Sequence, residues 1–254
     1  MNNFSVLTLN IWNYTYHWDK RLDLIVKLIS KENPDVIFLQ EVMQTDSENQ
    51  ADIISKLLGS EYSYVFAPTE KYHGDWTGTA IISKHKIAAH KILELSQDRQ
   101  DSQDNFKRSA LLATIENINF INTHLSLSKT ARARNIEEIL KIIRDLTGSI
   151  VFGGDFNCHT NDPVVMKIIE NDFQNTYQGT EPTWPVDNDL VLRAYQERYP
   201  GKELPYKIVP EHMDNIFVKG LVVQDSRLLS EKLGDIYASD HFGVVAKLKI
   251  QKDE

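Results

Sequence analysis

The stretch SIVFGGDFN, residues 149–157, gives the clearest indication of how this chain folds. Its apolar part is a short run of β-branched and aromatic residues closed by two glycines, which is typical of a buried strand. Asp155 and Asn157 follow at once. Such residues after a strand often serve only a turn, because both side chains can bond the local backbone. Whether they do more here depends on the residues that end the other strands.

A helical pattern precedes this strand, and the same order of elements occurs near the start of the chain. The first pattern leads through Gly148 to the strand at 149–154, and its apolar positions are Ile136, Ile139, Leu140 and Ile143. The second runs over 22–29, with Asp19 as a possible cap and Pro34 as a stop, and leads to DVIFLQ at 35–40. Glu41 follows that strand as Asp155 follows the other, so two helix-to-strand units each lead to an acid.

The region between these units is rich in predicted β-structure. A helix over 53–58, closed by Gly59, precedes five candidate strands, which are YSYVFA (62–67), TAIIS (79–83), IAAHKILEL (87–95), SALLATI (109–115) and INFINTH (118–124). No repeat, low-complexity tract or Gly/Ser/Pro-rich linker divides the chain. The sequence therefore predicts one continuous α/β domain over residues 1–254.

Polar side chains occupy the ends of other candidate strands as well. Asn10 ends the strand in SVLTLNI, His124 ends INFINTH, Asp214 precedes IFV, and SDH at 239–241 precedes the last apolar run. Each position alone has an ordinary explanation as a turn residue, a cap or a solvated strand terminus. Strand ends on one edge of a sheet converge in space, however, so residues far apart in sequence can build one site there. Taken together, these positions indicate a site that binds a cation.

Composition limits the class of protein. The chain has 254 residues, 41% of them hydrophobic, which is enough for a large core. No secretory leader and no run of about 18 apolar residues is present, so we expect a cytoplasmic protein without stable membrane association. Cys158 is the single cysteine, which excludes an intramolecular disulfide. We expect its thiol to pack and not to act as a nucleophile.

The charge of the chain is acidic. With 28 Lys and Arg against 36 Asp and Glu, the net charge is −8, which disfavours tight, non-specific binding to duplex nucleic acid. A local basic patch could offset this average. The candidates are KTARAR at 129–134 and the isolated Arg108, for which the alternatives are a solvated helix face and a surface salt bridge, respectively.

The motifs of the chain resemble those of the endonuclease/exonuclease/phosphatase superfamily of metal-dependent phosphoesterases. In order, they are LTLNIWN (7–13), PDVIFLQEV (34–42), TGTAIISK (77–84), FKRSALLATI (106–115), NTHL (122–125), GGDFN (153–157), HMDNIFV (212–218) and SDHFGV (239–244). The resemblance spans nearly the whole chain, and QE, GDFN and SDH in this order are its most specific part. It implies a four-layer α/β sandwich in which two mixed β-sheets pack face to face between flanking helices.

The resemblance also implies a cation bound by the strand-end residues. Hydrolysis of a phosphate ester needs a positioned water and neutralisation of charge on the phosphoryl oxygens, and a divalent cation serves both needs. Mg²⁺ prefers a few oxygen ligands and keeps several waters, with Mn²⁺ as a substitute. The expected metal ligands are Asn10, Glu41, Asp155 and Asp240.

The remaining site residues are expected to act on the substrate. We expect His241 to take part in proton transfer, with Asp214 fixing its tautomer and His124 completing the phosphate environment. Asp155 can also orient the attacking water. Substrate contacts are expected from Asn157, whose amide can donate to a phosphoryl oxygen, and from Arg108.

Two departures narrow the resemblance. The branch that repairs abasic DNA has a lysine soon after the QE acid, where this chain reads QEVM, and the usual Asp-Tyr pair is here Asp214-Asn215. Secreted sphingomyelinases share QEV and the THL histidine but carry an export signal and a membrane-contact hairpin. We therefore expect a phosphodiesterase acting on a small or single-stranded nucleotide-type substrate, with no protein partner inferred. Alternatives are a phospholipid or sugar-phosphate substrate, or a silent scaffold that binds phosphorylated ligands.

Aromatic residues and one long segment bear on substrate choice. Trp12, Trp76 and Trp184 lie near the expected site loops, where they could stack on a base or ring or could simply pack. The polar, aromatic segment 183–207 is either an insertion over the site that sets substrate choice or a covering loop with a short helix.

Overall fold

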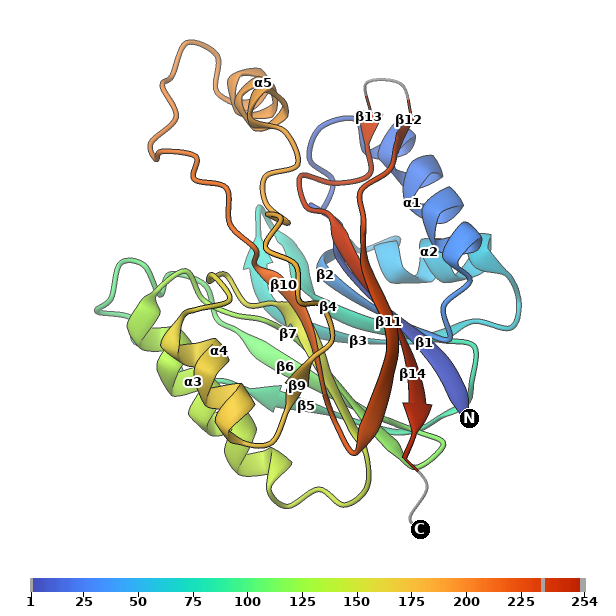
Figure 1. Ribbon diagram of the computed structural model, residues 1–254. Coiled ribbons are helices and arrows are strands. Elements are labelled where there is room, and N and C mark those ends of the chain that lie inside the picture. The colour runs from blue at the N-terminus through green and yellow to red at the C-terminus, as the bar shows by residue number, and fades with distance from the viewer. Residues whose placement is uncertain (1, 234–235, 252–254) are drawn as a thin grey trace.

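Two mixed β-sheets packed face to face form the centre of the molecule, and helices cover their outer faces (Figure 1). The structure is a computed structural model that describes residues 2–233 and 236–251. The four-layer α/β sandwich expected from the sequence is confirmed. No helix within the described residues is both long enough and apolar enough to cross a bilayer.

The first sheet has six strands in the order β11-β14-β1-β2-β4-β3. β1 and β2 run parallel, and every other neighbouring pair in this sheet is antiparallel. In chain order the strands are β1 (Asn3–Asn10), β2 (Val36–Gln44), β3 (Ser63–Tyr72), β4 (Asp75–Ser83), β11 (Leu221–Leu229) and β14 (Gly243–Ile250).

The second sheet repeats this plan in the order β5-β6-β7-β8-β10-β9. Its parallel pair is β7 with β8, and the other neighbours are antiparallel. The strands are β5 (Ile87–Glu94), β6 (Ser109–Ile115), β7 (Ile118–His124), β8 (Ile150–Asp155), β9 (Gln174–Asn175) and β10 (Asp214–Lys219), while β12 (Lys232–Leu233) and β13 (Ile236–Tyr237) pair separately. Each strand predicted between the two helix-to-strand units is present, as β3 to β7.

Parallel neighbours need a crossover, and a helix supplies it in both sheets. α1 (Trp18–Glu32) joins β1 to β2, and α3 (Lys129–Ile143) joins β7 to β8. These are the two helix-to-strand units inferred from the sequence. The other helices in the described residues are α2 (Gln50–Leu58), α4 (Pro163–Glu170) and α5 (Asn188–Arg198).

The ends of α1 and α2 test the predicted caps. Gly59 caps the C-terminus of α2, and α1 ends before Pro34, as expected. Asp19 is not the cap of α1: His17 takes that position with a left-handed backbone and makes no side-chain cap bond. Asp19 lies in the first turn instead, where a carboxylate still interacts favourably with the helix dipole.

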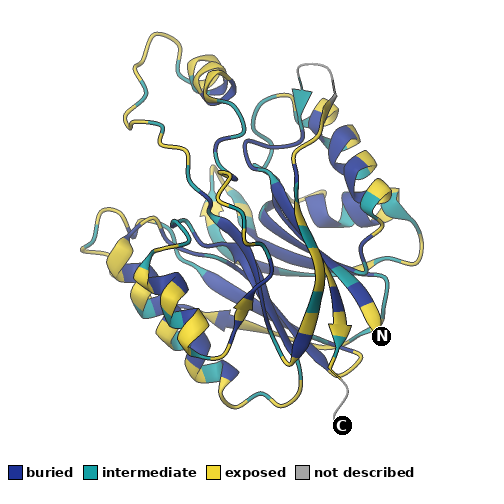
Figure 2. Ribbon diagram, viewed as in Figure 1, coloured by how far each residue is buried: buried dark blue, intermediate teal, exposed yellow. Residues whose placement is uncertain are grey.

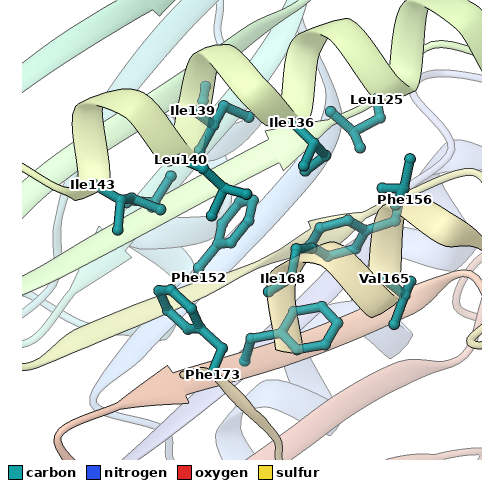
Figure 3. Close-up of a cluster of buried hydrophobic side chains, with 14 of the residues drawn as sticks. Leu125, Ile136, Ile139, Leu140, Ile143, Phe152, Phe156, Val165, Ile168 and Phe173 are labelled. Carbon is teal, nitrogen blue, oxygen red and sulfur yellow. The ribbon is translucent and has the colours of Figure 1, made fainter. Parts of the chain in front are cut away.

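Alternation along the strands divides the core into three layers. On β2, Val36 and Phe38 pack between the two sheets, whereas Ile37 and Leu39 face α1 and α2. The third cluster lies between the second sheet and helices α3 and α4, where apolar side chains of both helices meet the aromatic rings of Phe152 and its neighbours (Figure 3). Figure 2 shows the result, with buried strands at the centre and helices α1 to α4 that are exposed mainly on their outer faces. This rigid stack supports the strand ends that carry the polar residues.

Candidate active site

Polar residues of the second sheet meet at one edge because of strand direction. His124 is the last residue of β7 and Asp155 the last of β8, and the two are register partners in the parallel pair. Asp214 begins the antiparallel strand β10 and is the partner of Asp155 on its other side. Three strand ends predicted from separate motifs are therefore adjacent.

The position before Asp155 on β8 requires a glycine. The φ of Gly154 is +135°, and a Cβ built there would lie 1.9 Å from the carbonyl oxygen of Thr123 on β7. A residue with a side chain would push the two strands apart, so glycine keeps Asp155 next to His124.

A continuous series of four side chains, Asp214, His241, Asp155 and His124, forms the centre of the site, and all but the partly exposed His124 are buried. His241 Nδ1 lies 2.9 Å from Asp214 Oδ2, and its Nε2 lies 3.8 Å from Asp155 Oδ2. The Nε2 atom of His124 approaches the same Asp155 oxygen to 3.4 Å. Because His241 precedes β14 of the first sheet while the other members belong to the second, the series joins both sheets.

The environment shifts the pKa of the two histidines in opposite directions. Burial alone would lower the pKa of His241, but the carboxylates of Asp214, Asp240 and Asp155 outweigh it and hold that pKa well above its usual value. Burial, together with the positive charges of Arg108 and His241, holds the pKa of His124 well below its usual value. Near neutral pH the site therefore pairs a charged imidazolium with a neutral imidazole.

Burial also raises the pKa of two carboxyl groups. The pKa of Asp155 rises to about 6 and that of Asp240 to about 6, in each case mainly because burial penalises the charged form and despite the nearby His241. The Asp155 carboxylate is stabilised by the backbone N–H of Asn157 at 2.9 Å and by the amide of Asn10 at 3.1 Å. A cation bound at these oxygens would favour their charged forms.

Glu41 reaches the site from inside a strand. The sequence placed it after its strand, but β2 continues to Gln44, and Glu41 lies in a bulge at which the pairing with β4 shifts between Leu39 and Val42. Its φ of 55° is left-handed. The prediction of a strand end here was wrong because a bulge inserts an extra residue and redirects its side chain without ending the strand.

Two asparagines hold the carboxylate of Glu41. Asn10 Nδ2 donates to Glu41 Oε1 at 3.2 Å and also to Asp155, so it links the two acids. Asn13 Nδ2 donates to Glu41 Oε2 at 2.8 Å. Asn10 thus presents its amide nitrogen to the carboxylates, while its oxygen accepts the Trp12 N–H at 3.0 Å. The role of Asn10 as a metal ligand stays a prediction. In the observed orientation its amide nitrogen lies between the carboxylates of Glu41 and Asp155.

A cleft of about 290 Å³ opens over these residues. Arg108 lines it, and the buried guanidinium Nε of Arg108 has no hydrogen-bond partner among the described residues. Those residues also give Arg108 no ion pair, so the alternative of a surface salt bridge is wrong. The other predicted residues that line the cleft are Glu41, His124, Asp155, Asn157 and His241, whereas Asn10, Asp214 and Asp240 do not.

Asn157 and Asp240 each have a structural partner. The side-chain amide of Asn157 donates to the carbonyl of Leu125 at 2.8 Å, which leaves its second N–H for a ligand. Asp240 Oδ2 accepts from the indole of Trp184 at 3.0 Å, and its Oδ1 accepts from Ser239, whose hydroxyl accepts the backbone N–H of His241.

The residues fit a hard divalent cation. Oxygens of Asp155 and Asp214 lie within 4.8 Å of each other, and both residues are buried. Asp214 Oδ1 has no hydrogen-bond partner among the described residues, which is unusual for a buried carboxylate oxygen. Carboxylate oxygens are the ligands that Mg²⁺ prefers. Of the four predicted metal ligands only Asp155 belongs to this close group, so the ligand set stays a prediction.

Arg21 is a structural residue of the site that the sequence reasoning missed. Its side chain is 1% exposed and donates to the carbonyls of Ile11, Trp12, Asn13, Thr15, Tyr16 and Ala238. Burial lowers its pKa to about 10, although Asp240 and Glu41 favour its charge. It fixes the loop after β1, which carries Asn13, and the segment that leads to Asp240. Nothing in the local pattern of a helix reveals such a role.

The structure bears on two other expectations. KTARAR is not a solvated helix face throughout, because Arg132 is buried and donates to the carbonyls of Ser126 and Leu127, while Arg134 pairs with Asp104 at 2.8 Å. Their charges are satisfied internally, so the segment is no broad phosphate-binding patch. Cys158 is buried in the cluster beneath α3 and α4, and burial raises its pKa to about 12, as expected of a packing residue.

The three tryptophans have partners other than a ligand. The guanidinium of Arg21 lies 5.3 Å from the ring centroid of Trp12, and Trp184 donates to Asp240. Trp76 is 40% exposed, with the Lys71 ammonium 5.6 Å from its ring. None of the three lines the cleft.

Comparison with solved structures places the fold. A protein described as endonuclease/exonuclease/phosphatase from Bacteroides vulgatus is 19% identical and superposes with a TM-score of 0.76 over 99% of this chain and 100% of its own. A mannosyl-6-phosphatase from Bacteroides thetaiotaomicron (16% identity, TM-score 0.72, 96% and 99% covered) and D. rerio TDP2 complexed with a single-strand DNA product (17%, 0.72, 98% and 100%) share the fold. A search of curated proteins gave no significant match.

The sequence itself matches a family profile. The profile of the Endonuclease/Exonuclease/phosphatase family covers residues 7–241, from β1 to the end of the SDH motif. That span includes every residue that lines the cleft and all four residues of the series Asp214, His241, Asp155 and His124. The chain therefore belongs to the endonuclease/exonuclease/phosphatase family.

Proposed function

We propose that this protein is a Mg²⁺-dependent phosphodiesterase that acts on a small or single-stranded nucleotide-type ester. The observation that carries the proposal is the series of Asp214, His241, Asp155 and His124, which opens into a cleft next to the guanidinium of Arg108, whose Nε has no partner among the described residues. Two histidines with opposite pKa shifts beside a central carboxylate are typical of acid–base chemistry.

Each residue of the series has a role that follows from its charge. His241, charged and held by Asp214, can donate a proton to a leaving oxygen. Asp155 can orient the attacking water, and neutral His124 can hydrogen-bond a phosphoryl oxygen. Arg108 can neutralise phosphoryl charge, because no carboxylate pairs with it among the described residues.

The acidic residues of the cleft are the proposed site of the cation. Glu41 and Asp155 would hold Mg²⁺, with Asn10 between their carboxylates and Asp240 nearby. When bound there, the cation would neutralise charge on the phosphoryl group and on the leaving oxygen.

The charge of the molecule supports a small substrate. The net charge is −8, and the basic segment 129–134 is used internally, so nothing on these residues supplies the broad neutralisation that a long duplex needs. A neighbour in fold binds a single-strand DNA product and another is a mannosyl-6-phosphatase, so nucleotide and sugar-phosphate esters are the two classes to compare.

A substrate panel tests the proposal. Metal-stripped protein is assayed with and without Mg²⁺ on dinucleotides, short single strands, nucleotides, sugar phosphates, sphingomyelin vesicles and plasmid duplex at one salt concentration. We expect turnover that needs Mg²⁺ and favours the small or single-stranded esters. Binding of phosphorylated ligands without any turnover would identify a silent scaffold, and efficient duplex cleavage at physiological salt would overturn the proposed substrate class.

A further inference from the structure

A second cavity adjoins the cleft and has no role in the proposed phosphoester chemistry. This side pocket has a volume of about 380 Å³ and shares Asn13 and Tyr72 with the cleft. Its walls come from the loop 13–16, from Met43, from the turn between β3 and β4, and from residues 194–198 of α5. α5 lies at the top of Figure 1, beyond the ends of the strands. The segment 183–207 therefore supplies a wall next to the reaction centre.

Tyrosine is the most frequent residue type in the walls of the side pocket. Tyr14, Tyr16 and Tyr72 line it, each only partly buried. The ring of Tyr72 also lies 5.9 Å from that of Phe106, which lines the cleft, so aromatic surface continues from one cavity into the other. Tyrosine offers both a flat apolar face and a hydroxyl, which suits a ring that bears hydroxyl groups.

The charges of the side pocket disfavour a second phosphate. Asp75 and Glu197 line it, and the one arginine there, Arg198, is already bonded to His73 and stacked 5.3 Å from the centroid of Tyr72. A phosphate placed here would meet two carboxylates and compete for an engaged guanidinium. Carboxylates and hydroxyls can instead accept hydrogen bonds from sugar hydroxyls.

We propose that the side pocket binds an uncharged, hydroxyl-bearing ring of the substrate while the phosphate of the same molecule lies in the cleft. A sugar phosphate and the ribose of a nucleotide both present this chemistry. The proposal rests on the proposed phosphoesterase function and adds a specificity: one phosphate with a neutral ring beside it is accepted, and a second phosphate at that position is rejected.

The test compares matched substrates in the intact protein. With Mg²⁺ present, kcat/KM is measured on the methyl phosphodiesters of four compounds, which are a sugar phosphate, a nucleotide, the same nucleotide with a second phosphate on its ribose, and the ringless glycerol phosphate. Replacing Tyr16 by leucine should lower kcat/KM for the better ring substrate about tenfold, mainly through KM, as expected when one stacking contact is lost. The loss for glycerol phosphate should be several times smaller. The ring substrate whose kcat/KM falls more in Tyr16→Leu shows whether the pocket binds the ring of a sugar phosphate or the ribose of a nucleotide.

Two further variants keep the test independent of Tyr16. Glu197→Lys changes an exposed residue of α5 and should raise kcat/KM for the bisphosphate about threefold relative to the monophosphate at low salt. Tyr195→Leu removes a tyrosine of the same helix that does not line the pocket. It should leave unchanged the ratio of kcat/KM between ring and ringless substrates and the ratio between bisphosphate and monophosphate.

The outcomes separate the two proposals. Equal losses on ring and ringless substrates, or a wild-type preference for the bisphosphate, would overturn the ring specificity while the phosphoesterase activity stands. If no phosphate ester is turned over, the proposed function fails, and the pocket is tested directly by saturation-transfer NMR with free adenosine and free methyl glucoside. Transfer that Tyr16→Leu abolishes would still support the pocket, and absence of transfer to either compound would exclude it.

Discussion

Asp214, at the start of β10, contacts His241, which lies in the loop before β14. This contact favours the charged form of the His241 ring. Asp214→Asn keeps the shape but removes the largest favourable charge beside the ring, so the pKa of His241 should fall by about one unit or more. Titration of the ring by NMR measures this directly. Proton donation weakens as well, so kcat should fall by about 100-fold or more. An unchanged pKa would show that the two residues do not interact in solution.

The same shift affects stability in a defined pH range. The folded pKa of His241 lies above the unfolded value, so its contribution is fully present below the unfolded pKa and is lost as pH rises through the folded pKa. Denaturation at several pH values should therefore show the greatest difference between wild type and Asp214→Asn at mildly acidic pH, with the wild type the more stable.

Of the proposed cation ligands, Glu41 is the one that can be substituted with the least expected effect on the stability of the fold. Glu41→Gln preserves the size of a half-buried side chain but removes its charge, so Mg²⁺ affinity should fall by at least about tenfold with the melting temperature little altered. Calorimetric titration of Mg²⁺ measures the affinity. Glu61→Gln is the matched control, because Glu61 is exposed and does not line the cleft. Equal affinities in the wild type and Glu41→Gln would remove Glu41 from the cation site.

The identities of the site residues could be predicted from the sequence because each lies at a position marked by a local pattern. An apolar run followed by Asp155 or His124 can be recognised without knowing the fold. The place of Glu41 could not be predicted, because a bulge depends on pairing with β4, and pairing is not local. Asn13 was missed for the same reason: its contact with Glu41 depends on a loop whose shape is set by Arg21.

At the scale of elements, the loop after β1 depends on α1 through one side chain. Arg21→Met removes every hydrogen bond to the six carbonyls and leaves several of them buried, so the free energy of unfolding should fall by at least about 3 kcal/mol. Lys20→Met, at the exposed neighbouring position of the same helix, should change it by less than about 0.5 kcal/mol. Chemical denaturation compares the two variants.

A further measurement separates positioning from stability. In folded Arg21→Met, the loop that carries Asn13 is released, so Mg²⁺ affinity should fall beyond what Lys20→Met shows. If the variant is destabilised but binds Mg²⁺ as the wild type does, Arg21 supports the fold and does not position Glu41.

Helices and strands differ in how far the sequence predicted them. The strands β1 to β8, β10 and β14 and the helices α1 to α3 were recognised because their apolar residues form short runs or repeat with the helical period. The strands β9, β11, β12 and β13 were not predicted. The cap of α1 was not, because the loop before it is held by Arg21 and so brings His17 to the cap position where a local rule favours Asp19. The function of α5 was left open because its wall of the side pocket is formed with the β3–β4 turn, far away in sequence.

At the scale of the whole molecule, the site exists only while the two sheets are docked. The first sheet contributes Asn10, Glu41 and the segment before β14, and the second contributes His124, Asp155 and Asp214. Two similar parallel units, each with a helical crossover, thus place their strand ends against each other. The resemblance in sequence implied this arrangement, whereas strand patterns alone were compatible with it but would not have selected it.

A buried polar contact between the sheets, near this edge, provides the last test. Asn122 of β7 accepts from Gln40 at 2.7 Å and donates to the carbonyls of Leu39 and Ala80 at 2.9 and 2.8 Å, so one side chain of the second sheet makes three bonds to the first. Asn122→Leu removes these bonds and leaves buried polar atoms behind, and the free energy of unfolding should fall by about 3 kcal/mol or more.

Asn119→Leu is the matched control, because Asn119 lies on the same strand but its side chain bonds, among the described residues, only to Thr147 and Thr114, both within its own half of the molecule. In this variant the free energy of unfolding should fall by about 1 kcal/mol. Because the Asp214–His241 contact also crosses between the sheets, Asn122→Leu should lower the pKa of His241 toward its usual value, whereas Asn119→Leu should not. Denaturation together with the NMR titration distinguishes the cases: equal losses of stability and an unchanged His241 pKa in both variants would show that Asn122 does not control the docking of the sheets at the site.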